Sequence, residues 1–200
     1  MYIPHKYKNG NLAEVKDFLT KNSFGILVNQ VDGKPWATHI PMELETTDDG
    51  KDVLVSHIAK ANPQWKHFTE NDNVLCIFNG PHSYISSSWY KEEEVPTWNY
   101  IAVHVYGKIK ILTEEEVMAS MHKLVDKYEL NSKKPISLHN LSEKTLRQVK
   151  GVVGFQITIE SIQAAYKLSQ GREHDHERII KELENTNNPN ARDIANRMKE

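Results

Sequence analysis

Hydrophobic and polar residues alternate through much of the first 112 positions, a pattern typical of β-strands with one buried face. The dipeptide Asp32-Gly33 lies between two such stretches and predicts a tight hairpin turn. A bend or bulge is expected at Gly107, because glycine inside a long strand often marks one. The expected strands cover residues 24–31, 35–44, 53–58, 74–78, 83–89 and 98–112. Six or seven strands joined mostly by turns predict an antiparallel barrel and a mainly β fold.

Helical spacing occurs before, between and after these strands. Residues 11–21 repeat apolar positions at helical intervals, and a shorter helix is expected over 63–68. Thr113 and Glu116 form a capping box that opens a longer helix. The side chains expected to face inward on that helix are Val117, Met121, Leu124, Val125 and Tyr128.

The later part of the chain returns to a strand pattern at 151–160 and ends in a polar helical segment that is interrupted at 187–189. These features predict a domain with an insertion and a tail. The expected boundaries are a barrel domain over residues 1–172, a helical insertion at about 113–150 and a C-terminal tail over 173–200.

The composition limits partners and location. The 200-residue chain has a formal net charge of −2, so any contact with DNA must be local or built by a dimer. Residues 121–150 carry seven Lys or Arg against three acidic residues, and a solvated helical face is favoured there over a nucleic-acid surface. One cysteine cannot form an internal disulfide, which favours a reducing, cytoplasmic location. No apolar run approaches the roughly 20 residues of a membrane span.

Residues 57–66 combine groups that suit a phosphate. His57 ends a predicted strand, and Lys60 and Asn62 follow before the short helix that carries Trp65. Free N–H groups at a helix N-terminus, together with an ammonium group, bind anions well. The alternative is an ordinary strand-to-helix connection in which Lys60 points into water, because capped helix starts are common.

Residues 81–100 are rich in hydroxyl and aromatic side chains, the mixture that a flat heteroaromatic ligand requires. Ser86 and Ser88 are expected on one face of a strand, and Trp98 and Asn99 lie in the next strand. The alternative is a pair of ordinary strands with aromatic core residues. Two hydroxyl groups on one strand face argue against a purely apolar core.

Residues 37–41 form a third candidate site. A strand that ends in Pro41 cannot donate a backbone hydrogen bond there, so it is expected at a sheet edge or beside a ligand. Thr38 lies on one face of this strand and His39 on the other. A lone histidine is more often a packed or surface residue than a catalyst.

The sequence assigns no catalytic or metal-binding residue. Its ten histidines lack an HExxH motif, paired cysteines or a carboxylate spacing typical of zinc or iron. Cys76 lies among apolar strand residues and is expected to be inert. Motifs of the GxSxG, P-loop and GxGxxG types are absent, which excludes the commonest hydrolase, triphosphatase and dinucleotide-binding signatures.

Eight stretches along nearly the whole chain carry a family resemblance. They are Met1-Tyr-Ile-Pro4, Asn22-Ser-Phe-Gly25, Ala37-Thr-His-Ile-Pro41, His57-Ile-Ala-Lys-Ala-Asn-Pro-Gln-Trp65, Gly80-Pro-His-Ser-Tyr-Ile-Ser86, Val95-Pro-Thr-Trp-Asn-Tyr100, Gly151-Val-Val-Gly-Phe155 and Lys167-Leu-Ser-Gln170. In this combination and order the chain resembles the PaiB-type family of FMN-binding regulators.

The resemblance implies a split β-barrel that binds FMN as a homodimer, with the cofactor near the subunit interface. It implies that Lys60 and Asn62 hold the FMN phosphate and that Thr38 and His39 flank the isoalloxazine ring. The other cofactor-site residues that it implies are His57, Trp65, Ser86, Ser88, Trp98, Asn99, Lys167, Ser169, Gln170 and Arg172. The last four form a polar patch after the final strand and are expected to reach the partner's cofactor.

Two functions of different classes follow from the resemblance. The first is an FMN-binding, homodimeric transcriptional regulator that negatively controls sporulation and degradative-enzyme genes. The alternative, implied by relatives that share the barrel, is a flavin-dependent oxidoreductase or flavin reductase. Isoalloxazine performs redox chemistry itself, so neither function requires a cysteine or a metal from the protein.

Overall fold

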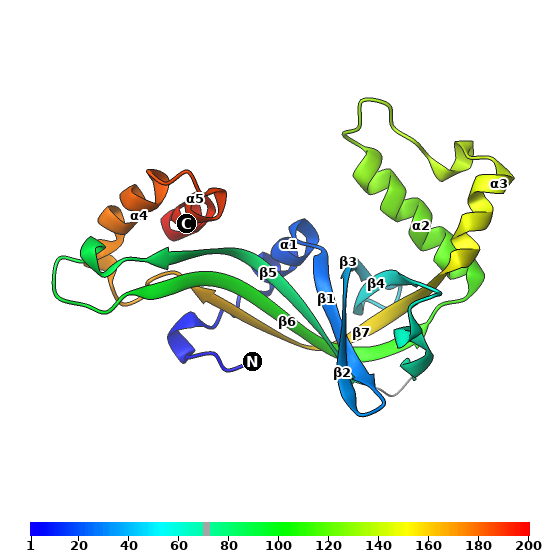
Figure 1. Ribbon diagram of the computed structural model, residues 1–200, viewed down its shortest axis with the longest axis horizontal. Coiled ribbons are helices and arrows are strands. Elements are labelled where there is room, and N and C mark those ends of the chain that lie inside the picture. The colour runs from blue at the N-terminus through cyan, green and yellow to red at the C-terminus, as the bar shows by residue number, and fades with distance from the viewer. Residues whose placement is uncertain (70–72) are drawn as a thin grey trace. The chain divides into compact units, whose positions relative to one another are not determined.

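The computed structural model describes residues 1–69 and 73–200. Its strands are β1 (Phe24–Val31), β2 (Lys34–Pro41), β3 (Glu43–Thr46), β4 (Asp52–Ala59), β5 (Asn73–Ile85), β6 (Thr97–Ile111) and β7 (Val152–Lys167) (Figure 1). Its α-helices are α1 (Leu12–Lys21), α2 (Glu114–Glu129), α3 (Glu143–Leu146), α4 (His176–Glu184) and α5 (Pro189–Lys199). The 3-10 helices are η1 (His5–Tyr7), η2 (Pro63–His67), η3 (Ser87–Trp89), η4 (Leu138–Asn140), η5 (Arg147–Gly151) and η6 (Glu173–Asp175).

The described strands form a seven-stranded sheet in the order β2-β1-β5-β6-β7-β4-β3. Strand β1 pairs antiparallel with β2 and β5, and β4 pairs antiparallel with β3 and β7. The predicted antiparallel, mainly β fold with added helices is confirmed, and β2 lies at a sheet edge as expected. Within the described residues, no helix has the length and apolar character to cross a membrane.

The chain divides into two compact units. The terminal unit comprises residues 1–18, 78–104 and 163–200, and the central unit comprises residues 19–77 and 105–162. Strands β5, β6 and β7 each contribute residues to both units. The expected boundary at residue 172 between a barrel domain and a tail stays a prediction.

In the central unit, β1 and β2 form the predicted hairpin. Asp32 and Gly33 both have positive φ angles, 51° and 76°, which is the conformation of a type I′ turn. The single strand expected over 35–44 is instead two strands, because β2 ends at Pro41 and β3 starts at Glu43. Proline has no N–H to continue the ladder, and the chain passes through the fully buried Met42 to a new partner, β4.

Strand β6 runs through Gly107 without interruption, and the bend or bulge expected there stays a prediction. The glycine is required by a close approach. A Cβ atom at this position would lie 2.2 Å from the carbonyl oxygen of Thr158 in β7. Any side chain there would push the two strands apart.

Helix α2 begins with the predicted capping box. The Thr113 backbone N–H donates to Glu116 Oε2 at 2.8 Å, and the Glu116 N–H donates to Thr113 Oγ1 at 3.2 Å. The inward face predicted for this helix is only partly buried. Val117 is buried, whereas Met121, Leu124 and Val125 are half-buried and Tyr128 is 54% exposed. Of these side chains, Leu124 lines one cavity and Val117 lines another.

In the terminal unit, the strand expected over 83–89 ends at Ile85 and is followed by the 3-10 helix η3. Ser86 and Ser88 therefore do not share a strand face, and that prediction is wrong. The Ser86 hydroxyl caps η3 by accepting the Ser88 N–H at 3.3 Å, and the two hydroxyl oxygens lie 2.9 Å apart. A local serine cap competes with strand extension at this point.

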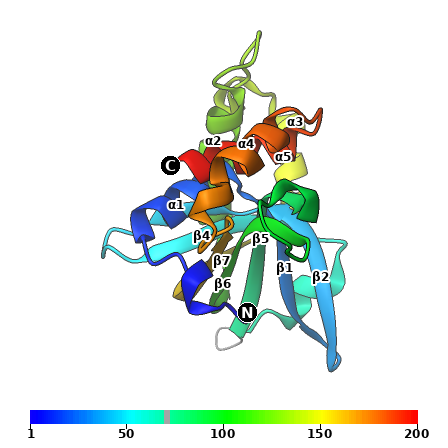
Figure 2. The same ribbon diagram turned by 90° about the vertical axis from the view of Figure 1, so that its left-hand side faces the viewer.

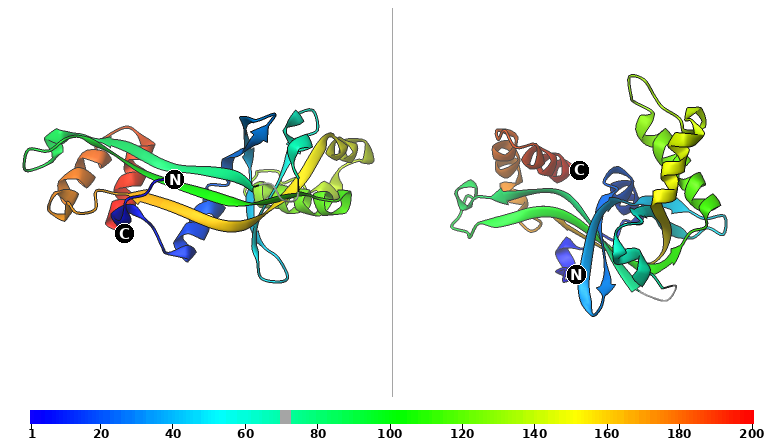
Figure 3. Two further views of the ribbon diagram at one scale, coloured as in Figure 1. Left: turned by 90° about the horizontal axis from the view of Figure 1, so that it is seen from below. Right: turned by 45° about the vertical axis from the view of Figure 1, so that its right-hand side comes forward.

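The two predicted C-terminal helices are present as α4 and α5, which pack together (Figure 2, Figure 3). Asn188 caps α5 and Pro189 occupies its first turn, which explains the interruption between the helices. Their apolar sides join a core cluster formed by Ile85, Tyr90, Ile179, Leu183, Ala191, Ile194 and Ala195. The helices are amphipathic and contribute to the core of the terminal unit.

Candidate functional site

A buried amide network fixes the start of η2 to the β1–β2 hairpin. The Asn62 side-chain amide donates to Thr38 Oγ1 at 3.0 Å, and the Thr38 hydroxyl donates to Gln64 Oε1 at 2.5 Å. Gln64, which is fully buried, donates to Asn29 Oδ1 at 2.9 Å. The network thus joins β1, β2 and η2 within the central unit. Gln64 and Asn29 were not predicted as important; the signal for Gln64 was its place directly after a capped Pro63.

The start of η2 offers few free N–H groups to an anion. Pro63 has none, and the Gln64 N–H donates to the capping Asn62 Oδ1 at 3.0 Å. The helix is also a five-residue 3-10 turn with little dipole. The helix N-terminus therefore adds little to the predicted phosphate site, and the contribution of Lys60 dominates.

Lys60 is exposed, and its ammonium group makes no hydrogen bond or ion pair with the part of the chain that the structure describes. Its backbone is held firmly, because its N–H donates to the Gly151 carbonyl at 2.8 Å and its own carbonyl accepts the Trp65 indole N–H at 2.9 Å. A free cation on a fixed backbone is suited to binding an anion.

Lys60 and Trp65 line a cavity of about 620 Å³ in the central unit, which we call the Lys60 cavity. Arg147 and Lys150 add two cations to its wall, and Glu114 and Glu143 add two carboxylates. Arg147 and Glu143 are 4.0 Å apart and largely exposed, so their attraction is weak. The apolar wall consists of Ile111, Leu112, Val117, Met118, Leu146, Val149, Val152, Val153 and Gly154. The sequence placed Arg147 and Lys150 on a solvated basic face and did not predict this site.

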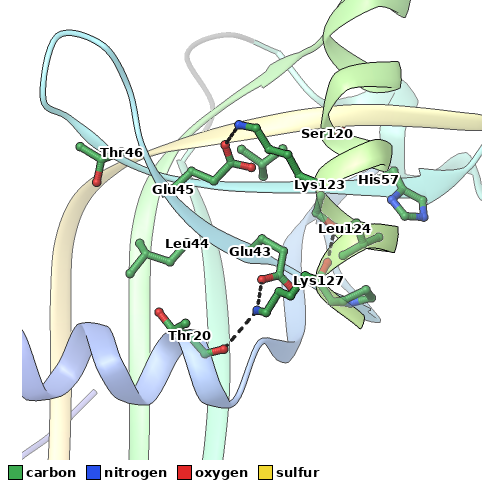
Figure 4. A pocket seen from close by; sticks show the side chains of 13 residues that line it. Thr20, Glu43, Leu44, Glu45, Thr46, His57, Ser120, Lys123, Leu124 and Lys127 are labelled. Carbon is green, nitrogen blue, oxygen red and sulfur yellow. Dashed lines mark hydrogen bonds and ion pairs between the residues drawn. The ribbon is translucent and has the colours of Figure 1, made fainter. Parts of the chain in front are cut away.

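His57 lies in a different cavity of the central unit, of about 390 Å³, which we call the His57 cavity (Figure 4). Burial lowers the pKa of His57, and the imidazole has no hydrogen-bond partner among the described residues. Its other lining residues are Thr20, Pro41, Glu43, Leu44, Glu45, Thr46, Val55, Ser56, Ser120, Lys123, Leu124 and Lys127. His57 and Lys60 are therefore close in sequence but face separate cavities.

His39 lies on the exposed face of edge strand β2. Its ring stacks on Phe24, with the ring centres 6.4 Å apart and an angle of 29° between the planes. Phe24 is 66% exposed, so this pair presents an open aromatic surface. Thr38, on the opposite face, is turned into the amide network.

In the terminal unit, Asn99 and Ser169 are turned toward each other. They are 0% and 4% exposed, and the Asn99 amide donates to Ser169 Oγ at 2.9 Å. The His176 ring lies 3.0 Å from the Ser169 carbonyl, and Ser169 has a φ angle of 63°, unusual for a residue other than glycine. These contacts tie β6 to the segment that leads into α4.

The remaining polar patch of the terminal unit is also paired internally. Arg172 forms two contacts of 2.8 Å with the Glu94 carboxylate and lies over the Tyr90 ring. Lys167 donates to Thr97 Oγ1 at 2.5 Å. The Gln170 amide donates to the Tyr166 carbonyl at 2.6 Å, and its oxygen accepts the Leu168 N–H.

Trp98 differs from its neighbour Asn99, because it is 48% exposed. Its indole N–H donates to His82 Nδ1 at 3.2 Å, and its ring lies 6.0 Å from that of Tyr84. These side chains form an aromatic surface over β5 and β6 of the terminal unit. It adjoins a hollow of about 520 Å³ that also includes Gly80.

Across residues 1–69 and 73–200, no group of three or more His, Cys, Asp or Glu side chains is arranged to hold a metal ion. Cys76 is fully buried, and burial raises the pKa of its thiol far above neutrality, which makes it unreactive.

The chain is similar to known proteins along its whole length. It is 46% identical over 202 residues to the protease synthase and sporulation protein PAI 2 of Bacillus subtilis, covering 100% of this chain and 97% of that protein. It is 29% identical over 243 residues to the uncharacterized protein AN0679 of Emericella nidulans, with 100% and 97% coverage.

Two solved structures share its fold at low sequence identity. The flavocytochrome Anf3 of Azotobacter vinelandii has a TM-score of 0.64 and 15% identity, covering 86% of this chain and 76% of that one. The FAD and heme binding protein of Mycobacterium smegmatis has a TM-score of 0.62 and 12% identity, covering 80% and 73%. These likenesses agree with the split β-barrel that the resemblance implied. A family model described as "Putative FMN-binding domain" matches residues 1–161, and the chain therefore belongs to the PaiB-type family of FMN-binding proteins.

Proposed function

We propose that FMN, the cofactor of the family, binds to the central unit with its phosphate at the cations of the Lys60 cavity. The observation that carries the proposal is the unpaired ammonium group of Lys60, which lies on a fixed backbone beside Arg147 and Lys150. A phosphate dianion requires such charges, because ammonium and guanidinium groups donate strong hydrogen bonds to it.

The rest of the Lys60 cavity fits the other parts of FMN. The aliphatic wall and Trp65 provide apolar surface for the tricyclic ring, and Glu114 and Glu143 can accept hydrogen bonds from ribityl hydroxyls. When bound, isoalloxazine supplies the redox chemistry. The protein's own residues bind the phosphate, orient the ring and exclude water from one side of it.

For the cellular role, we propose a homodimeric transcriptional regulator of the PaiB type. Identity of 46% over 97% of PAI 2, a protein named for protease synthesis and sporulation, supports this role. The chain's net charge of −2 supplies no general attraction to DNA, so direct binding requires a local basic surface. A mobility-shift titration at low salt tests this: retarded promoter DNA supports direct regulation, and unshifted DNA contradicts it.

A flavin-dependent oxidoreductase is the second candidate, because the solved structures that share the fold are named as flavin or heme-flavin proteins. The two roles differ in the reactivity of bound FMN. Bleaching of the flavin absorbance by NADH or NADPH at a catalytic rate favours the oxidoreductase, and an inert flavin favours the regulator.

The phosphate site is tested with Lys60→Ala. Loss of a hydrogen bond to a charged group costs about 1.5–3 kcal/mol, so the Kd for FMN should rise about ten- to hundredfold. Flavin fluorescence measures the Kd, and Lys34→Ala, an exposed lysine outside both cavities, is the matched control. Wild-type affinity in Lys60→Ala would contradict the site, and a wild-type protein that does not bind FMN would contradict the cofactor.

A further inference from the structure

We propose that helix α2 is a movable wall of the Lys60 cavity, and that two lysine–glutamate pairs between α2 and β3 position this wall and thereby set the affinity for FMN. The inference rests on the proposed function of that cavity. It assigns Glu43, Glu45, Lys123 and Lys127 as positioning residues that do not touch the cofactor.

The two pairs are matched in register. Glu43 and Glu45 are two residues apart on β3 and share one face of the strand. Lys123 and Lys127 are four residues apart on α2 and share one face of the helix. Lys123 Nζ lies 2.5 Å from Glu45 Oε2, and Lys127 Nζ pairs with Glu43 Oε2, so the two elements are joined at two points (Figure 4).

We call Lys127–Glu43 the inner pair and Lys123–Glu45 the outer pair. The inner pair is reinforced by further contacts. Lys127 also donates to the Thr20 carbonyl at 3.3 Å, and the Tyr128 hydroxyl donates to Glu43 Oε1 at 2.8 Å. The outer pair has no such support among the described residues, and the Lys123 side chain is 67% exposed. The inner pair therefore acts as the stronger attachment, and the outer pair is open to competition from salt.

Apolar packing is tightest at the first turn of α2, whereas Met121, Leu124 and Val125 farther along are half-buried. Val117, in its first turn, is the residue of this helix that is buried. Ser120 and Leu124 also line the His57 cavity. Since Val117 is the residue of this helix that is buried, the ion pairs contribute to where its later turns lie.

The same helix forms part of the Lys60 cavity. Glu114, Val117 and Met118 line that cavity, whereas Ser120, Lys123, Leu124 and Lys127 line the His57 cavity. The Val117 side chain lies against Gly154 of β7, where a Cβ atom would come within 2.4 Å of it. Packing this close has no free space, so a shift of α2 must change the shape of the Lys60 cavity.

Charge reversal tests the proposal. We expect Lys127→Glu and Glu43→Lys to raise the Kd for FMN about five- to tenfold and to speed hydrogen exchange of the α2 backbone amides. Lys123→Glu and Glu45→Lys should have weaker effects and raise the Kd about two- to threefold. Added salt weakens the Lys123–Glu45 pair of the wild type, so the difference in Kd between the wild type and these variants should disappear at high salt. Combining the two reversals of a pair should restore most of the lost affinity and the slow exchange. Lys133→Glu, an exposed lysine beyond α2, is the matched control and should change neither.

Each outcome has a consequence. Wild-type FMN affinity in both inner-pair reversals overturns the proposal, as does an outer-pair double reversal that recovers nothing, because no other described contact complicates that pair. Hydrogen exchange separates this inference from the proposed function. If wild-type protein does not bind FMN but exchange in α2 follows the reversals, the cofactor site is wrong and the ion-pair attachment of α2 stands.

Discussion

The two units of this protein use the same kinds of polar side chain for different purposes. In the terminal unit, Asn99 of β6 pairs with Ser169, and Arg172 pairs with Glu94 in the segment before β6. Ser169 and Arg172 lie between β7 and α4, so both contacts hold that segment in place. In the central unit, Lys60 lies at a cavity with no partner in the described chain. The Asn99 amide N–H is paired inside the unit, although its buried Oδ1 has no partner among the described residues, whereas the Lys60 ammonium group lies beside a cavity where a ligand can reach it.

The same difference separates the cofactor-site residues that the resemblance implied into two groups. In the terminal unit, Asn99, Lys167, Ser169, Gln170 and Arg172 make hydrogen bonds within the unit, whereas the Trp98 ring is open to solvent. Those of the central unit include both kinds, because Thr38 and Asn62 belong to the amide network while Lys60 and His57 face cavities. The roles of these residues toward FMN remain predictions, and four substitutions test the division.

The largest effect is expected in the core of the terminal unit. Leu183 of α4 is fully buried in the core cluster with Ile85 and residues of α5, and Leu183→Ala should reduce the free energy of unfolding by about 2–5 kcal/mol. Urea unfolding followed by circular dichroism measures the loss. Leu130→Ala, which removes a leucine that is 77% exposed, is the control and should have almost no effect. The folded Leu183→Ala protein should keep its FMN affinity, and a loss of affinity would contradict the division of roles.

A smaller effect is expected for Asn99→Ala. The substitution removes the donor to Ser169 inside the terminal unit and should cost about 1–3 kcal/mol of stability. The Kd for FMN should not change, which is the opposite of the result expected for Lys60→Ala. If Asn99→Ala remains fully folded and fails to bind FMN, the asparagine contacts the cofactor and the internal role is wrong.

The smallest effect concerns pH and compares the two units directly. Burial lowers the pKa of His57 in the central unit, and burial followed by repulsion from the positive N-terminus lowers that of His104 in the terminal unit. Below a pH of about 6.5 the imidazoles of the unfolded chain bind protons that the folded ones do not. The contribution of these two histidines to the free energy of unfolding is therefore fully present above that pH and is lost as the pH falls.

Unfolding experiments at pH 7.5 and pH 5.5 should therefore show a smaller loss of stability on acidification in His57→Gln and in His104→Gln than in the wild type. Equal losses in all three proteins would show that neither imidazole is held neutral by burial. An effect in His57→Gln alone would place the acid sensitivity at the His57 cavity.

Much of the fold was predictable because it depends on neighbours in the sequence. The Asp32-Gly33 turn, the capping box of α2 and the break before Pro189 each depend on a few adjacent residues, and each was predicted correctly. The errors arose where a distant element decides. The single strand expected over 35–44 divides at Met42 because its second half pairs with β4, and only the approach of Thr158 shows that Gly107 permits close packing.

The candidate site was predictable to a smaller degree. The stretch from His57 to Trp65 was identified correctly as a place of interest, but the cations that join Lys60 come from Arg147 and Lys150, about 90 residues later in the sequence. Spacing along the chain carries no signal for such a meeting. The solvated basic face expected there includes two residues that line a cavity.

By itself the sequence determined most of the strands and helices, the family and the cofactor class, because turns, caps, alternation and long motifs are all local patterns. Only the tertiary structure decided which polar groups are satisfied, since satisfaction depends on partners brought from distant positions. It paired Asn99 with Ser169, left Lys60 without a described partner, and made α2 the common wall of two cavities. The physical reason is that hydrogen bonds and ion pairs act over a few ångströms in space, whatever the separation along the chain.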